Sequence, residues 1–270
     1  MPATATRPIT RKSERRKADH DDAVNERYDS HGLCSAPLRL REFFRRGPMT
    51  HPPMTIAHVT AERGYSGGER QVALLIDGLR ARGHGSLLLC PPDSESEIRA
   101  RASGIRCLPI RARSVWSHRD FQEVTARLRQ ASPDVVHLHS GRATWLGGLA
   151  ARRLRLPALT TRRMDRPVRR GWRTRLIYER SVDRVAAVSE AVRQRLLDGG
   201  VPEDRIQVIH SAVAPHRATA PRDVLRKTLG VEDDRPCLLV AAALVKRKGI
   251  DILLSAISTL ADEGYTTTLW

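Results

Sequence analysis

From Met54 onward, short apolar segments alternate with longer segments of helical periodicity, and this alternation constrains the fold more than any other feature. Seven runs of four to six residues have the β-branched and leucine-rich composition of buried strands. Strands that alternate with helices form a parallel sheet with helices on both faces. We therefore predict an α/β protein with a Rossmann-like parallel sheet. The expected strands are 56–60, 86–90, 105–110, 134–139, 156–160, 184–188 and 206–209.

The segments between these strands predict helices, several of which end at glycine or proline. The first expected helix, for example, stops at Gly83. The expected helices lie near 69–82, 98–102, 121–128, 145–154, 176–182 and 189–198.

The pattern divides the chain into four parts. Residues 1–53 carry no sustained period and are predicted to be disordered, or to be an extension upstream of the real start. Residues 54–211 form the first domain, 212–220 a linker, and 221–270 a second domain. In the second domain we expect helices near 224–229 and 250–260 and strands at 237–244 and 265–270. Two strands are too few to close a core. We therefore expect a second Rossmann-like domain that is truncated.

A glycine-containing loop follows the first strand and leads into a helix. It carries Gly64, Gly67 and Gly68. Glycine allows close approach of the backbone, and the free N–H groups at a helix start attract anions. A tight turn without a ligand is the alternative interpretation. The Gly-x-Gly-x-x-Gly dinucleotide fingerprint is not met.

Polar residues also follow several of the other predicted strands. Ligands of open parallel sheets bind beyond the carboxyl ends of the strands, so these residues are candidates to line a cleft. His137 and His139 share a strand face, but no third ligand is evident, and we expect no metal site. The candidates are His137, His139, Ser140, Arg162, Arg163, Asp165, Ser189, Glu190, His210 and Ser211.

Charge and cysteine content limit the possible partners. The net charge is +17, and residues 141–184 hold thirteen arginines against three acidic residues. Such a field favours phosphates or acidic lipid, although a solvated surface would look the same. We expect no aromatic residues interleaved with this run as a stacking platform, and therefore no nucleic-acid partner. The scattered cysteines and the absence of a signal or transmembrane segment predict a cytoplasmic protein.

Several motifs, in this order, carry a family resemblance. They are Tyr-Ser-Gly-Gly-Glu-Arg at 65–70, Asp-Val-Val-His-Leu-His-Ser at 134–140, Ala-Val-Ser-Glu-Ala-Val at 187–192, Gly-Val-Pro at 200–202 before Ile-Gln-Val-Ile-His at 206–210, and Lys-Gly-Ile-Asp at 248–251. The pattern resembles glycosyltransferase family 4, whose members are retaining enzymes of the two-domain GT-B type. Arg-Arg-Met-Asp-Arg-Pro at 162–167 is similar to a subgroup associated with bacterial envelope polysaccharide and lipopolysaccharide.

The resemblance implies transfer of a sugar from a nucleotide-sugar donor to the hydroxyl of a glycan or lipid-linked acceptor, without a cofactor or metal. It implies that Gly67 and Gly68 face the reacting sugar across a gap between the domains, and that Lys248 holds the donor diphosphate together with Gly68. Arg162 and Arg163 lie where many relatives place a histidine near the sugar. They grip phosphate or belong to the arginine-rich surface. That surface suggests contact with an anionic membrane, at the inner face of the plasma membrane.

Three departures from the family pattern matter. The family commonly has an arginine where this chain has Ala243, so Lys246 or Arg247 would have to replace it. The usual Asn-Gly-Val-Asp turn is Ser-Ala-Val-Ala at 211–214. A Glu-x7-Glu segment that holds the donor ribose would lie beyond Trp270, so we expect this chain to be an inactive fragment. A non-catalytic remnant that binds an anionic glycan, lipid or partner is the alternative. A Rossmann-type dehydrogenase or epimerase is disfavoured, because Tyr-x-x-x-Lys is also missing.

Overall fold

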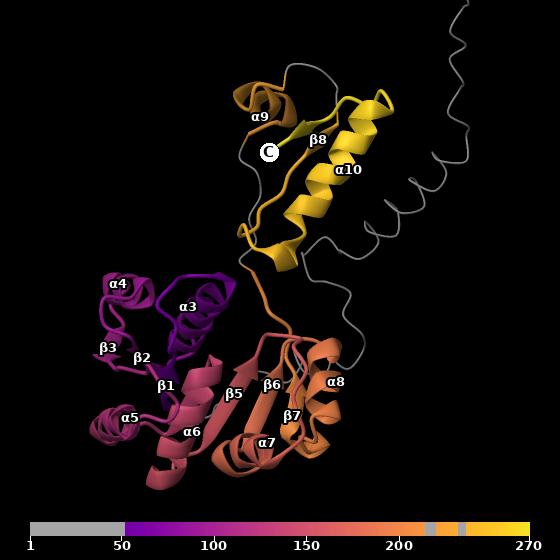
Figure 1. Ribbon diagram of the computed structural model, residues 1–270. Helices are drawn as coiled ribbons and strands as arrows, with labels where there is room; N and C mark the ends of the chain where they lie inside the picture. The colour runs from indigo at the N-terminus through magenta and orange to yellow at the C-terminus, as the bar shows by residue number, and fades with distance from the viewer. Residues whose placement is uncertain (1–51, 214–219, 232–235) are drawn as a thin grey trace, which may run out of the picture. The chain divides into compact units, whose positions relative to one another are not determined.

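The computed structural model describes residues 52–213, 220–231 and 236–270 (Figure 1). The expected N-terminal extension, 1–53, and linker, 212–220, lie largely outside the described residues. The chain divides into two compact units between His210 and Ser211.

The first unit is built on one seven-stranded sheet in which every pairing is parallel. The strand order is β3-β2-β1-β4-β5-β6-β7. The predicted Rossmann-like parallel sheet is therefore confirmed. Its strands are β1 (Thr55–Val59), β2 (Gly85–Cys90), β3 (Arg106–Pro109), β4 (Val135–Leu138), β5 (Ala158–Arg162), β6 (Arg184–Ala187) and β7 (Ile206–Val208).

Helices cover both faces of this sheet. Leu88 and Cys90 of β2 pack with residues of α3 and α4, whereas Leu87 and Leu89 belong to the larger core with α5, α6 and α8. Alternate residues of a strand point to opposite faces, so these two cores lie on opposite sides. The helical elements are α3 (Gly67–Arg80), α4 (Glu95–Ala102), α5 (His118–Ala131), α6 (Gly141–Leu154), α7 (Trp172–Arg175), the π-helix η1 (Leu176–Ser181), α8 (Glu190–Asp198) and the 3-10 turn η2 (Glu203–Arg205).

Two of the differences from the predicted helices have an identifiable local cause. α6 begins at Gly141 and not at Trp145, because the Ser140 hydroxyl caps it by accepting the Ala143 N–H at 3.4 Å. The helix expected over 176–182 is a π-helix that continues α7, and the Ser181 hydroxyl donates to the Leu176 carbonyl at 2.6 Å. Wider turns of this kind are rare within helices.

The second unit is small. It holds α9 (Arg222–Thr228), β8 (Cys237–Leu238), the 3-10 turn η3 (Lys246–Lys248), α10 (Ile250–Asp262) and β9 (Thr268–Leu269), and β8 pairs with β9 in parallel. The strand predicted over 237–244 is wrong beyond Leu238. A strand needs a neighbour for its hydrogen bonds, and among the described residues β8 pairs only with two-residue β9. Leu244 is accordingly 88% exposed. No helix in the described ranges has the length and apolar character that crossing a bilayer requires.

Two glycines of α6 let this helix pack closely on its neighbours. A Cβ at Gly148 would lie 3.1 Å from the Ser181 carbonyl oxygen and 3.2 Å from Ser181 Cβ. A Cβ at Gly147 would lie 2.5 Å from Leu138 Cδ2. Since the contact at Gly148 is partly with backbone, the neighbour cannot move away by rotating a side chain.

We therefore predict that Gly148→Val destabilises the chain by about 1–3 kcal/mol through overpacking. Gly78→Ala is the matched control, because Gly78 lies in α3 and its Cβ would meet only the flexible Arg82 side chain at 3.6 Å. That variant should be neutral or more stable by up to about 1 kcal/mol. Urea denaturation followed by circular dichroism measures both. Equal effects of the two substitutions would contradict the packing described here.

Candidate functional site

The candidate site lies where the strand order reverses. β1 pairs with β2 on one side and with β4 on the other. The chain moves outward from β1 to β3 and then returns to continue from β4 to β7. In open parallel sheets the ligand crevice forms at the carboxyl ends of the two strands that flank such a reversal. A ligand site is therefore expected at the loops after β1 and β4.

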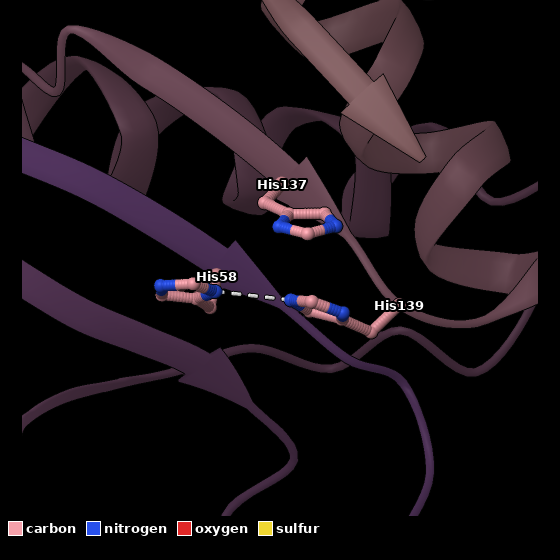
Figure 2. A group of neighbouring side chains, drawn as sticks. All are labelled: His58, His137 and His139. Carbon is pink, nitrogen blue, oxygen red and sulfur yellow. Dashed lines mark hydrogen bonds between the residues drawn. The ribbon is translucent and has the colours of Figure 1, made fainter. Parts of the chain in front are cut away.

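Three buried histidines meet at this position (Figure 2). His58 of β1 is directly opposite His137 of β4 in the sheet register. His139 follows β4 and comes from the same face two residues later. Each of the three is less than a tenth exposed.

Hydrogen bonds fix the protonation of two of these rings. Arg163 donates from Nη1 to the His139 carbonyl at 3.2 Å, and its Nη2 lies 3.4 Å from His139 Nδ1. A guanidinium can only donate, so Nδ1 of His139 is the acceptor and its proton is on Nε2. That proton is directed at His58 Nδ1, 3.0 Å away (Figure 2). The proton of His58 is therefore on Nε2, which is buried and has no partner among the described residues.

His137 is held separately, by a hydrogen bond of 2.7 Å between its Nε2 and the Thr161 hydroxyl. Its ring centroid is 4.0 Å from that of His139.

The expectation that no third potential ligand lies near His137 and His139 is wrong, because His58 provides a third imidazole. The nitrogens of the three rings lie within 4.8 Å of one another. Sequence spacing missed His58 because it comes from a different strand. The sequence does contain a signal for His58. If β1 pairs with β4, His58 and His137 occupy matching positions and point to the same face of the sheet.

The arrangement nevertheless does not form a chelate. The His58 and His139 rings are nearly parallel, at 15°, with centroids 5.3 Å apart and the two facing nitrogens 3.0 Å apart. Each nitrogen is aimed at the other and not at a common third point about 2.0–2.1 Å from both, as zinc would need. Arg163 also places a positive charge beside His139. The residues do not fit a metal ion without reorientation of the rings.

Burial keeps all three histidines neutral. It lowers the pKa of His58 to about 4. Burial first, then the repulsion that a protonated His58 and Arg163 would exert, lower the pKa of His137 to about 3. The pKa of His139 is well below its usual value, chiefly through burial and then through His137, His58 and Arg163. Burial also lowers the pKa of Arg163, although Glu69 acts in the opposite direction.

The start of α3 lies beside this cluster. A Cβ at Gly68 would be 3.8 Å from Arg163 Cδ, so the loop after β1 and the end of β5 are in contact. The helix already has its own cap. Ser66 accepts the Gly68 N–H at 3.3 Å, and the Glu69 carboxylate accepts the Ser66 N–H at 2.8 Å. This capping box occupies N–H groups that the sequence offered to an anion.

Arg162 and Arg163, which the sequence presented as a pair, have separate roles. Arg162 donates to the Tyr178 hydroxyl at 3.3 Å and to the Arg166 carbonyl at 2.6 Å. Arg163 points to the opposite face, toward His139. Strand alternation accounts for the separation. The structure thus brings Arg163, Gly68, His137 and His139 together and places Arg162 elsewhere.

The other predicted residues mostly have local partners. Ser140 accepts the Ala61 N–H at 3.2 Å in addition to capping α6, which ties the loops after β1 and β4 together. Ser189 caps α8, and Glu190 pairs with Arg193 at 3.6 Å. The remaining three, Asp165, His210 and Ser211, are exposed, and His210 Nδ1 lies 3.2 Å from the Val188 carbonyl.

In the second unit, Lys246 and Lys248 are exposed on η3, immediately before α10. α10 begins after Gly249 in the left-handed conformation and has no side-chain cap. In the first unit, by contrast, a serine side chain caps each of the helices α3, α6 and α8. Among the described residues, no side chain occupies the first N–H groups of α10 as a cap.

A cavity of about 310 Å³ opens between α3 and α4. Glu69 and Tyr65 line it near the glycine loop, and Arg99 stacks over Tyr65 at 4.4 Å. The Ser96 hydroxyl in its wall is buried without a partner among the described residues. Sequence reasoning did not find this cavity. Its apolar floor is formed by Val72, Ala73, Ile76, Leu88, Ala100 and Ile105.

We predict a loss of stability in mild acid from the buried histidines. Their folded-state pKa values lie below the unfolded value of 6.5. Their contribution is therefore complete above pH 6.5 and is lost as the pH falls toward about 4 and then 3. Each can contribute a slope of up to about 1.4 kcal/mol per pH unit.

His58→Asn tests this prediction, because the Asn amide oxygen can replace the acceptor Nδ1. Urea denaturation between pH 7.5 and 5 should show a slope shallower by about one proton for the variant. His118→Asn, at an exposed histidine of α5, is the matched control for the chemistry of the substitution. An unchanged slope for His58→Asn would show that His58 is not buried neutral.

The sheet order, the glycine loop and the site at the strand-order reversal define a Rossmann-like domain of the GT-B glycosyltransferase architecture. The profile of glycosyltransferase family 4 matches residues 65–217, more than half of the chain. The chain belongs to glycosyltransferase family 4.

Individual proteins are similar over most of the chain. A GDP-mannose-dependent alpha-mannosyltransferase of Mycobacterium tuberculosis is 28% identical over 214 residues, which cover 70% of this chain and 55% of that protein. The crystal structure of a glycosyltransferase from Rickettsia africae has a TM-score of 0.62 and 21% identity, over 78% of this chain and 58% of that one. Anabaena HepE in complex with UDP and glucose has a TM-score of 0.61 and 18% identity, over 76% and 58%. The chain spans somewhat more than half the length of these relatives.

Proposed function

We propose that the protein transfers a hexose from a nucleoside-diphosphate donor to an acceptor hydroxyl with retention of anomeric configuration. The observation that carries this proposal is the family match over residues 65–217, which contains Gly67, Gly68 and Arg163. The similarity to a mannosyltransferase whose name specifies GDP-mannose makes this donor the first to test. The proposal requires no cofactor or metal.

Arg163 is the proposed cation at the reacting sugar and its phosphates. It is partly buried, contacts the Gly68 position, and keeps a buried Nε that has no partner among the described residues. His139 holds its terminal nitrogens in place through two contacts. A fixed guanidinium stabilises negative charge that develops on a leaving diphosphate without having to reorganise.

The second unit supplies the proposed diphosphate contacts. Lys246 and Lys248 precede the uncapped start of α10. A point charge beside free helix N–H groups is a favourable place for phosphate.

The cavity between α3 and α4 is the proposed position for an apolar part of the acceptor. Its volume of about 310 Å³ is at the lower end of the range for ligand sites. Glu69 lines it next to Gly68, so an acceptor bound there would approach the glycine loop. This location fits a lipid-linked or glycan acceptor of bacterial envelope or lipopolysaccharide synthesis at the cytoplasmic face of a membrane.

A binding remnant without catalysis is the second candidate function, and Ala243 in place of the usual arginine favours it. Donor labelled in the sugar separates the two. Transfer or slow hydrolysis of the sugar by this chain supports an enzyme, whereas binding without either supports the remnant.

We predict that Lys248→Ala weakens binding of GDP-mannose by about 10- to 100-fold, because it removes a charge-assisted contact of about 1.5–3 kcal/mol. Isothermal titration calorimetry measures the affinity. Lys227→Ala, at an exposed lysine of α9 in the same unit, is the control and should bind as the parent chain does. The assignment of Lys248 fails if both variants bind equally.

We predict opposite outcomes at the two adjacent arginines. Arg163→Ala should lower donor affinity or turnover at least about tenfold, since a cation at the site is lost. Arg162→Ala should leave donor affinity unchanged and lower the free energy of unfolding by about 1–3 kcal/mol, because the bonds to Tyr178 and Arg166 are lost. The reverse pattern, with donor binding sensitive only to Arg162, would overturn the assignment.

A further inference from the structure

Three tryptophans and one arginine form a row on the surface of the first unit. The Arg173 guanidinium lies over the Trp116 ring at 5.1 Å and over the Trp172 ring at 5.3 Å. Trp116 in turn contacts Trp145, with ring centroids 5.8 Å apart. We call these four residues the tryptophan–arginine row. The expectation that no aromatic residues accompany the arginine run is wrong, since Trp145 and Trp172 lie within it.

The exposure of this row is unusual. Trp116 is 65% exposed and Trp172 is 63% exposed. The whole sequence has four tryptophans, and three of them are in the row. Tryptophan is highly buried on average, and exposed apolar groups that gather in one place mark interaction surfaces.

The segment that carries Trp172 is strongly basic. Residues 162–175 contain seven arginines and a single acidic residue, Asp165. Arg166, Arg169, Arg170, Arg173 and Arg175 are exposed, and Met164 beside them is 53% exposed. Arginines next to apolar and aromatic side chains match the headgroup region of a bilayer, where tryptophan rings insert and basic residues meet acidic lipid.

The segment is held in shape by the rest of the unit. Val168 packs against Gly199 so closely that a Cβ there would lie 2.5 Å from Val168 Cγ1. Arg170 donates from Nε to the Asp198 carbonyl at 2.8 Å, and Arg162 donates to the Arg166 carbonyl at 2.6 Å. These contacts fix the backbone that leads to Trp172, so the exposed position of its side chain is a defined feature of the fold.

The members of the row come from three different crossover connections of the sheet. Trp116 follows β3, Trp145 lies near the start of α6 after β4, and Trp172 follows β5. The connection that carries Trp172 begins with Arg163, which contacts the Gly68 position.

We propose that the tryptophan–arginine row docks the protein on the headgroup region of a bilayer that contains anionic lipid. Trp116 and Trp172 insert, and Arg173 with its neighbouring arginines pairs with lipid phosphates. Docking would hold the first unit, with its candidate site, at the membrane that carries a lipid-linked acceptor. Only this last consequence rests on the proposed function. The binding itself does not require sugar transfer.

Vesicle flotation tests the proposal with the full chain. Vesicles of phosphatidylcholine with about one-third phosphatidylglycerol should capture the chain at 0.1 M salt and release most of it at 0.5 M salt. The emission of tryptophan should shift to shorter wavelength on binding. Trp116→Ala/Trp172→Ala should lower the partition coefficient at least about tenfold, because two large apolar side chains no longer insert. Arg173→Glu should lower it as well.

Matched controls separate docking from general attraction. Trp270→Ala removes the fourth tryptophan, and Arg82→Ala removes an exposed arginine outside the row. Both should bind as the parent chain does, and all variants should unfold at the parent temperature within a few degrees. The proposal is overturned if the row variants bind like the controls or if neutral vesicles bind equally well. It is also overturned if a soluble oligosaccharide shifts the tryptophan emission and vesicles do not.

A donor-binding measurement keeps the test of membrane docking separate from the test of the proposed function. Donor binding by the parent chain and by Trp116→Ala/Trp172→Ala should be equal in the absence of vesicles. Loss of vesicle binding with intact donor binding assigns the row to docking. Donor binding that is absent throughout would count against the proposed transfer and leave the docking result unaffected.

Discussion

The pairing of β1 with β4 is the constraint on which the rest of the first unit depends. It makes β1 the strand at which the sheet order reverses, and its register sets His58 opposite His137. A slip of one residue would turn these side chains to the other face and bring Ala57 into their place. The hydrogen bond from His139 to His58, and with it the position of Arg163 beside Gly68, exists only in the observed register.

The N–H groups of the glycine loop are not the main source of positive charge at the candidate site. In the first unit, Ser66 caps α3, and Glu69 adds a carboxylate at the place where a phosphate was expected. The nearby cation is Arg163, and neutral histidines surround it because burial disfavours their charged form. In the second unit the helix start is uncapped and two lysines precede it. The glycines of the first unit thus provide space, and side chains provide charge.

The sheet could be predicted from the sequence because strand length and apolar composition are local signals. Contacts between distant segments could not. His58 was missed because its partners are 79 and 81 residues away, and only the strand order brings them together. The apolar run after Leu238 looked like a strand, but a strand also needs a neighbour, which local sequence does not reveal. The sequence presents Arg162 and Arg163 as equivalent, whereas strand alternation directs their side chains to different partners. The tryptophan–arginine row follows no period, since the packing of α6, α7 and the connection after β3 brings its members together.

The most direct test of the account is where a sugar nucleotide binds on this chain. In nitrogen-15 NMR spectra, titration with GDP-mannose should shift the backbone resonance of Gly68 and the side-chain Nε–H of Arg163, while Gly78 in the same helix stays unchanged. Shifts confined to residues far from the carboxyl edge of the sheet, with Gly68 and Arg163 unmoved at saturating donor, would contradict the assignment of the site.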